Sequence, residues 1–173
     1  LYIAELMHQV GIPQGIVQVA TGDGTAGAAV IDVVDYIHVT GSTATGRKVA
    51  MRAAERLIPY SLELGSKDPL IILRDSNLDL AATGALKGAF ENAGQACVST
   101  ERVYVEEAIY EPFIERVRHF TKKIKVGPGD GMNVNVGSLT NERELVRVER
   151  HLDEAVAKGA RIITGGKRRP DLG

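Results

Sequence analysis

The feature that most constrains the fold is the alternation of short apolar runs with longer amphipathic segments along nearly the whole chain. Strand-like runs occur at residues 15–20, 36–40, 60–64, 70–73, 102–105 and 161–164. Segments of helical periodicity occur at residues 25–34, 43–57, 79–92, 108–125 and 141–158. Strands joined by helical crossovers are typical of an open, mostly parallel sheet. The sequence therefore predicts an α/β fold.

The alternation is interrupted at residues 65–69, Gly-Ser-Lys-Asp-Pro. Such a break can join two α/β domains, so we predict one domain over residues 1–65 and a second over residues 66–173. A glycine-rich loop is expected at residues 126–131, inside the second domain. Because clefts between domains commonly hold sites, the break also indicates where chemistry is to be sought.

The composition argues against several kinds of partner. The 21 basic and 22 acidic residues leave a formal net charge of −1, which gives no reason to expect nucleic-acid binding. A single cysteine cannot form an internal disulfide, and no apolar run approaches the roughly 20 residues that span a bilayer. No basic leader precedes the first apolar residues. We therefore expect a cytoplasmic protein with no membrane partner and no metal site.

Residues 22–27 form a literal Gly-x-Gly-x-x-Gly between a predicted strand and a predicted helix. A dinucleotide-binding fingerprint also needs an acidic residue about 20 positions further on, and residues 41–48 contain none. Asp23 would in addition place a negative charge inside the phosphate cradle. We therefore favour a tight strand-to-helix turn over conventional dinucleotide binding here.

A second glycine turn, Thr-Gly-Ser-Thr-Ala-Thr-Gly at residues 40–46, also joins a strand to a helix. It offers hydroxyl groups and the amides of a helix start, with Arg47 and Lys48 close by and no carboxylate to oppose them. The same residues could equally serve as an ordinary helix N-cap. From spacing alone, phosphate binding and capping stay equally supported.

Two side chains are candidates for chemistry. Cys97 follows a predicted helix, and the small residues around it leave the thiol uncrowded, although a lone cysteine is more often a small buried apolar residue. Glu63 lies between Leu62 and Leu64 at the end of a strand, so the alternation turns it to the opposite face from both leucines. It is either an ordinary surface carboxylate or a residue of a site.

Three stretches together resemble the aldehyde dehydrogenase superfamily. Residues 39–46 match its turn Phe-Thr-Gly-Ser-Thr-x-x-Gly, with Val39 in place of Phe. Residues 62–67 match Leu-Glu-Leu-Gly-Gly-Lys, with Ser66 in place of the second Gly. Residues 90–97 match Phe-x-Asn-x-Gly-Gln-x-Cys in full. The resemblance runs from about residue 11 to the last residues and identifies the chain as an internal piece of such an enzyme.

The resemblance implies a fold and a reaction. Residues 1–65 would be the C-terminal part of a Rossmann-like cofactor domain, and residues 66–173 the N-terminal part of the catalytic, thiol-bearing domain. Cys97 would attack an aldehyde to give a thiohemiacetal, which passes a hydride to NAD or NADP, and Glu63 would activate the water that hydrolyses the thioester. The positive charge of the oxidised nicotinamide would favour the thiolate of Cys97, since only the thiolate is nucleophilic.

The resemblance also implies cofactor contacts. Gly41, Ser42 and Gly46 would lie near the pyrophosphate, Gly22 nearer the adenosine, and the backbone of Leu64 on the nicotinamide side. The backbone N–H of Cys97 would form part of an oxyanion hole. The complete protein would be a homodimer or homotetramer, and the piece alone is expected to be inactive because family segments on both sides are missing.

Three other interpretations remain. A CoA-acylating semialdehyde dehydrogenase generally lacks the base at the position of Glu63, so its presence favours hydrolysis. A non-catalytic relative is disfavoured by the intact pair of Cys97 and Glu63. A relative of γ-glutamyl phosphate reductase is disfavoured by the signature at residues 62–65. The string at residues 90–102 is similar to bacterial succinate-semialdehyde dehydrogenases, which makes a semialdehyde one candidate substrate.

Overall fold

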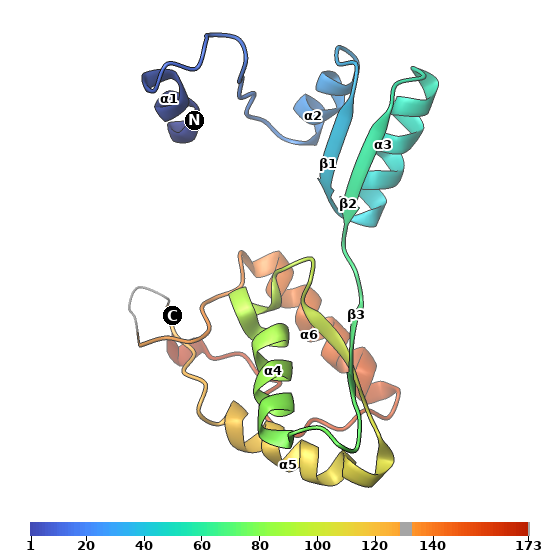
Figure 1. Ribbon diagram of the computed structural model, residues 1–173, viewed down its shortest axis with the longest axis vertical. Coiled ribbons are helices and arrows are strands. Elements are labelled where there is room, and N and C mark those ends of the chain that lie inside the picture. The colour runs from blue at the N-terminus through green and yellow to red at the C-terminus, as the bar shows by residue number, and fades with distance from the viewer. Residues whose placement is uncertain (129–132, 173) are drawn as a thin grey trace. The chain divides into compact units, whose positions relative to one another are not determined.

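The computed structural model describes residues 1–128 and 133–172 (Figure 1). The chain divides into two compact units, Leu1–Gly65 (unit 1) and Ser66–Gly173 (unit 2). Each unit contains a two-stranded parallel sheet whose strands are joined through a helix. This is the α/β arrangement with parallel strands that the alternation of apolar runs predicts.

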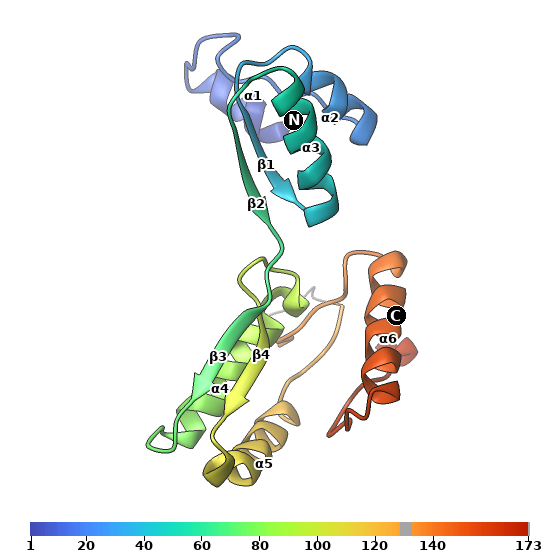
Figure 2. The same ribbon diagram turned by 90° about the vertical axis from the view of Figure 1, so that its right-hand side faces the viewer.

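Unit 1 is built around one strand–helix–strand crossover. Its elements are α1 (Tyr2–Gln9), α2 (Gly24–Ile31), β1 (Ile37–Gly41), α3 (Thr43–Glu55) and β2 (Tyr60–Leu64). In Figures 1 and 2, α3 runs alongside the pair of strands that it connects. The core consists of one buried side chain from α2, one from β1 and two from α3, namely Ile31, Ile37, Val49 and Ala53. These apolar contacts hold α2 and α3 on one face of the sheet.

Unit 2 repeats the crossover and adds further helices. Its elements are β3 (Asp68–Ile72), α4 (Leu78–Phe90), η1 (Glu91–Gly94), β4 (Thr100–Val105), η2 (Glu107–Ile109), α5 (Tyr110–Thr121), α6 (Glu142–Ala157) and η3 (Pro170–Leu172). The core joins the sheet to α4 and α5 through Ile72, Ala82, Ala85 and Phe113. The start of β3 is held by Arg102, whose guanidinium donates to the carbonyl oxygen of Lys67 at 2.6 and 2.8 Å.

Four helices begin at a polar residue that caps them. Asp23 accepts from the amide of Thr25, Ser42 from that of Thr45, Asn77 from those of Asp79 and Leu80, and Asn141 from that of Glu144. The first amides of a helix have no partner within it, so each cap contributes about 1 kcal/mol. These caps explain why the helices start where they do.

Two predicted strands do not form. Residues 15–20 and 161–164 are irregular, and their apolar side chains, such as Val17 and Ile162, are exposed. A strand needs a neighbour to satisfy its amides and carbonyls, and within the described part of the chain neither segment has a ladder partner. The prediction of these two strands was therefore wrong, because an apolar run does not by itself provide a neighbouring strand.

Part of the predicted loop at residues 126–131 falls outside the described residues, which resume at Asn133. At its described start, Val126 forms an isolated parallel bridge with Val136. Over residues 1–128 and 133–172, no helix is both long and apolar enough to cross a membrane. Over the same residues, no group of three or more potential metal ligands comes together.

Candidate functional site

Cys97 lies in unit 2, in the turn that leads from η1 into β4, and its thiol is free and exposed. The backbone reverses just before it through three residues of left-handed conformation, Asn92, Ala93 and Gly94, with φ of 51°, 57° and 75°. A Cβ added at Gly94 would lie 2.9 Å from the carbonyl oxygen of Ala89. Only glycine avoids both the strain and this contact, so Gly94 sets the tight exit from α4.

Ser99 fixes the end of this turn. It is buried, and its hydroxyl donates to the carbonyl oxygens of Gly88 and Ala89 at 3.2 and 3.5 Å. These carbonyls lie in the last turn of α4, where helix carbonyls lack partners within the helix. The amide of Ser99 also donates to the carbonyl of Ala96 at 3.1 Å. The residue two positions after the thiol is therefore tied to the end of the helix.

Gln95 fixes the start of the turn. Its carbonyl oxygen Oε1 accepts from the amide and from the hydroxyl of Thr140, at 2.8 and 2.6 Å. Its Nε2 donates to the carbonyl of Asn92 at 3.1 Å, while Nδ2 of Asn92 donates to the carbonyl of Gln95 at 3.0 Å. Neither Gln95 nor Ser99 is predicted from the sequence to have a role in a site. Gln95 could have been noticed because it belongs to the motif before Cys97, whereas nothing in the sequence marks Ser99.

Glu63 lies in unit 1 on β2, in register with Thr40 on β1, and its side chain is exposed. Leu62 packs against the core of unit 1 and Leu64 contacts α3 at Gly46. The carboxylate therefore points away from the face that α3 covers, as the alternation along the strand predicts.

The glycine turn at residues 41–46 caps the start of α3 and also leaves two backbone amides there without a partner in the helix. Ser42 Oγ accepts from the amide of Thr45 at 3.2 Å, and the carbonyl of Ser42 accepts from the amide of Gly46 at 2.8 Å. The amides of Thr43 and Ala44, in the first turn of α3, have no partner within the helix. Capping by Ser42 and anion binding at the start of α3 are therefore compatible, because they use different amides.

Gly46 has a packing role in addition. It is buried, and a Cβ at this position would lie 2.7 Å from Cδ2 and 3.0 Å from Cδ1 of Leu64. Glycine thus lets α3 approach the end of β2 closely. Two residues predicted to contact the cofactor, Gly46 and Leu64, are in direct contact with each other.

A hollow of about 1010 Å³ lies in unit 1 beside this turn, between α2, α3 and β1. Small residues of α2, including Gly24, Gly27 and Ala28, form one wall, and Thr45 and Lys48 of α3 form another. The carboxylate of Asp32, which also lines the hollow, is paired with Arg52 at 2.8 Å. The residues present therefore fit a flat, largely apolar group that carries an anionic extension towards the start of α3.

The other glycine turn is closed by its own carboxylate. Asp23 Oδ1 accepts from the amide of Thr25 at 2.8 Å, and hydrogen bonds from the amides of Thr25 and Ala26 hold the pKa of Asp23 below its ordinary value. A negative charge thus already occupies the start of α2. A Cβ on Gly22 would collide with Ala26, so this glycine is needed for the turn itself. Conventional phosphate binding here is disfavoured, as the sequence indicates.

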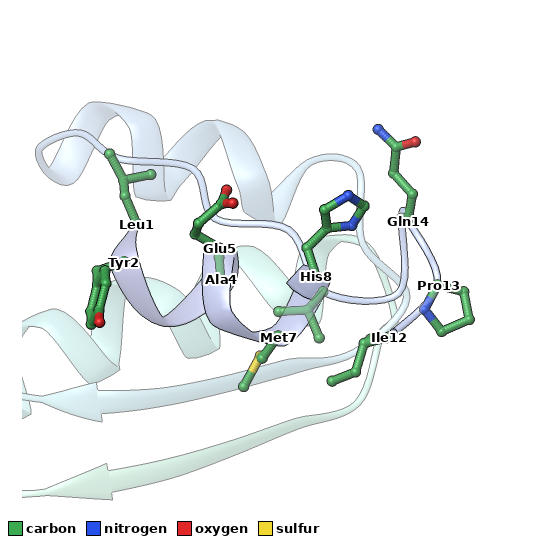
Figure 3. Close-up of a pocket in the computed structure, with 11 residues that line it drawn as sticks. Leu1, Tyr2, Ala4, Glu5, Met7, His8, Ile12, Pro13 and Gln14 are labelled. Carbon is green, nitrogen blue, oxygen red and sulfur yellow. The ribbon is translucent and has the colours of Figure 1, made fainter. Parts of the chain in front are cut away.

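A further hollow, of about 510 Å³, lies at α1 and the loop that follows it (Figure 3). Tyr2, His8 and Gln14 are among the side chains around it. The carboxylate of Glu5, which also lines it, accepts from Nε2 of Gln9 at 3.1 Å. None of the site residues predicted from the sequence lines this hollow, so it is separate from the candidate site.

Comparison with known proteins gives one consistent family. The model of the aldehyde dehydrogenase family matches residues 1–173. A protein of Mycobacterium bovis BCG named "Putative succinate-semialdehyde dehydrogenase [NADP(+)] 2" is 44% identical over 174 residues, which cover 100% of this chain and 34% of the relative. The crystal structure of an Escherichia coli NADP-dependent enzyme aligns with a TM-score of 0.94 and 37% identity, over 98% of this chain and 36% of that one.

The NAD+ complex of an aldehyde dehydrogenase from Bacillus cereus aligns with a TM-score of 0.95 and 34% identity, over 99% of this chain and 36% of that one. The chain thus spans about a third of the length of the relatives that it matches. The parallel α/β fold is the one that these solved structures share.

Proposed function

Because the chain belongs to the aldehyde dehydrogenase family, we propose that the protein containing it oxidises an aldehyde to a carboxylic acid with NAD or NADP as the acceptor. The observation that carries this proposal is Cys97, an exposed thiol in a turn that is fixed on both sides by Gln95 and Ser99. A merely structural cysteine would be buried among apolar side chains. A nucleophile needs this combination of access and fixed position.

The residues of the chain divide the reaction between them. The thiolate of Cys97 adds to the aldehyde carbon, and the backbone N–H of Cys97 donates to the oxygen that gains negative charge. The dinucleotide, which the turn with Gly41, Ser42 and Gly46 would hold, would supply the acceptor for the hydride that leaves this carbon. Glu63 then takes a proton from water, whose oxygen attacks the resulting thioester carbon. The carbon–sulfur bond breaks, the acid leaves, and Cys97 is again a thiolate.

The dinucleotide would be held by unit 1. The amides at the start of α3 and the turn with Gly41, Ser42 and Gly46 suit the pyrophosphate, because they present N–H groups to an anion. The hollow beside the turn suits the adenosine, with Gly22 on that side, and the backbone of Leu64 would contact the nicotinamide portion.

The substrate class is proposed from the relatives. The Mycobacterium bovis protein carries succinate-semialdehyde in its name, and a semialdehyde bearing a carboxylate is therefore the first aldehyde to try. The CoA-acylating alternative is disfavoured by Glu63, since transfer to a thiol needs no base for water. Assembly as a homodimer or homotetramer and a cytoplasmic location remain predictions from the resemblance.

The test uses the full-length protein with Cys97→Ser and Glu63→Gln. We expect Cys97→Ser to lower kcat by at least about 10³-fold, because the nucleophile is lost. Glu63→Gln should lower steady-state turnover by about 10²–10⁴-fold, the usual contribution of a general base. Rapid mixing should still give one equivalent of reduced dinucleotide per subunit with Glu63→Gln, because acylation precedes the water step.

The control is Glu111→Gln, which neutralises an exposed carboxylate on α5 and should leave turnover unchanged. Full turnover by Cys97→Ser would overturn the proposal. Turnover that requires added coenzyme A would favour the acylating alternative. The 173-residue chain alone should be inactive, since it spans about a third of its relatives.

A further inference from the structure

We propose that Gln95 and Thr140 are positioning residues for Cys97, and that their hydrogen bonds set the reactivity of the thiol. The pair of hydrogen bonds from Thr140 to Gln95 Oε1 is called the Gln95–Thr140 tether below. This inference rests on the proposed function, because it assigns to the tether the placement of the nucleophile.

The first support is the geometry of the contact. The carbonyl oxygen of the Gln95 side chain accepts from the Thr140 hydroxyl at 2.6 Å and from the Thr140 amide at 2.8 Å. Both lengths lie in the range of well-formed hydrogen bonds. The partners are 45 positions apart in the sequence, so the contact exists only because the fold brings two segments together. Nε2 of Gln95 also reaches the carbonyl of Ser138, at 3.5 Å.

The second support is that the tether fixes the turn that carries Cys97. Gln95 stands two residues before Cys97, and its side chain also closes the left-handed segment through the carbonyl of Asn92. Cys97 is exposed and free, so the backbone of the turn fixes its Cβ and limits the positions that the sulfur can reach. Ser99 fixes the end of that backbone on α4, and Gln95 fixes its start.

The third support is that the other end of the tether, Thr140, lies at the start of α6. Thr140 directly precedes Asn141, the residue whose side chain caps α6 by accepting from the amide of Glu144 at 3.1 Å. The backbone at Thr140 is therefore fixed by the start of a 16-residue helix. The tether thus couples the turn of the nucleophile to a rigid element far along the chain.

The experiment compares variants of the full-length protein that remove one arm of the tether at a time. Gln95→Ala removes all side-chain contacts of Gln95, and Thr140→Val removes the hydroxyl but keeps the shape and the amide. Thr140→Ser restores the hydroxyl. The matched control is Thr83→Val, because Thr83 Oγ1 donates only to carbonyls of its own helix, those of Asp79 and Leu80.

Two readouts are needed, and both are taken from about pH 6 to 10, a range that extends to both sides of the ordinary pKa of a cysteine thiol, about 8.5. One is the alkylation rate of Cys97 by iodoacetamide, followed by mass spectrometry of its peptide. The other is steady-state kinetics. We expect Gln95→Ala to lower kcat by about 10–100-fold with little change in KM for the dinucleotide, since an ångström of misplacement can cost about 10²-fold. Alkylation should change in rate and in pH profile.

Thr140→Val should lower kcat by about 3–10-fold, because the hydroxyl arm of the tether is lost while the amide arm stays, and Thr140→Ser should restore it. The double variant Gln95→Ala with Thr140→Val should have the same kcat as Gln95→Ala alone, because the two substitutions break the same contact. Thr83→Val should behave as the unaltered protein.

Two outcomes would overturn the inference. One is a folded Gln95→Ala protein whose alkylation rate and kcat stay within about twofold of the unaltered protein. The other is a loss of thermal stability with unchanged kinetics per folded molecule, which would make the tether structural only. Failure of the proposed function is distinguishable, because Cys97→Ser would then keep turnover while the alkylation series still reports on the tether.

Discussion

The two units use the same strand–helix–strand crossover but carry their candidate residues at opposite ends of strands. In unit 1 the glycine turn follows β1, and Glu63 lies in the last residues of β2. This is the carboxyl edge of parallel strands, where α/β sheets usually bind ligands. In unit 2 Cys97 stands after α4 and before β4, at the amino end of a strand. The usual rule therefore locates the candidate residues of unit 1 and would miss Cys97.

The two regions also differ in how they are fixed. The turn of unit 1 is closed by contacts between residues three or four apart, such as Ser42 with Thr45 and with Gly46. The turn of unit 2 is closed by Ser99 on α4 and by Gln95 on Thr140, 45 residues away. A locally closed turn can be built from its own sequence, whereas the thiol turn depends on the fold of its whole unit.

The largest expected effect breaks the thiol turn. Gly94→Ala should destabilise unit 2 by about 3 kcal/mol. Alanine is strained in the left-handed conformation, and its Cβ would lie too close to the carbonyl oxygen of Ala89. Faster amide hydrogen exchange at the end of α4 and in β4 would measure this. The control is Gly84→Ala in α4, where a Cβ meets nothing within 4 Å. It should stabilise the unit by about 0.5–1 kcal/mol, and equal effects of the two substitutions would contradict the account.

A smaller effect is expected at the matching position of unit 1. Gly46→Ala should cost about 1–3 kcal/mol, since α3 and the side chain of Leu64 must move apart. Exchange in β1 and β2 should rise while β3 and β4 stay protected. Gly27→Ala, which faces open space on α2, serves as the control and should not accelerate exchange in β1 and β2. Faster exchange confined to unit 2 would refute the prediction.

The smallest effect concerns a long-range ion pair of unit 2. Arg168 donates to Glu149 and Glu142 at 2.7 and 2.8 Å, which holds the pKa of Glu149 below its ordinary value. A lowered pKa gives stability that is present above the unfolded value, about 4.3, and is lost as the pH falls through the lower folded value. The difference in urea midpoint between the protein and Glu149→Gln should therefore be present at neutral pH and vanish in acid.

The contribution of this ion pair is small because its side chains are well exposed to solvent. Arg168→Gln should reproduce the pattern, while Glu111→Gln should show none. A midpoint difference that stays constant from neutral to acid pH would show that the ion pair is not its source.

The sequence correctly predicted the structural elements that are determined by neighbouring residues in the chain. The strand at residues 60–64 and the helix starting at Thr43 were foreseen from apolar periodicity and a glycine turn. The strands expected at residues 15–20 and 161–164 were wrong, because pairing depends on a partner that the local pattern does not contain. Cys97 and Glu63 were found by motif, and their roles stay predictions. Gln95 and Ser99 were missed, since their partners are set by the tertiary fold.

The contacts around the thiol turn have one more consequence. The hydroxyl of Ser99 donates to the main-chain carbonyls of Gly88 and Ala89. The side-chain nitrogen Nε2 of Gln95 donates to the main-chain carbonyls of Asn92 and Ser138. Every amino acid supplies such a carbonyl, whatever its side chain. Substitutions at Ala89 and Ser138 would therefore leave these acceptors in place, whereas substitutions at Gln95 and Ser99 would remove the donors.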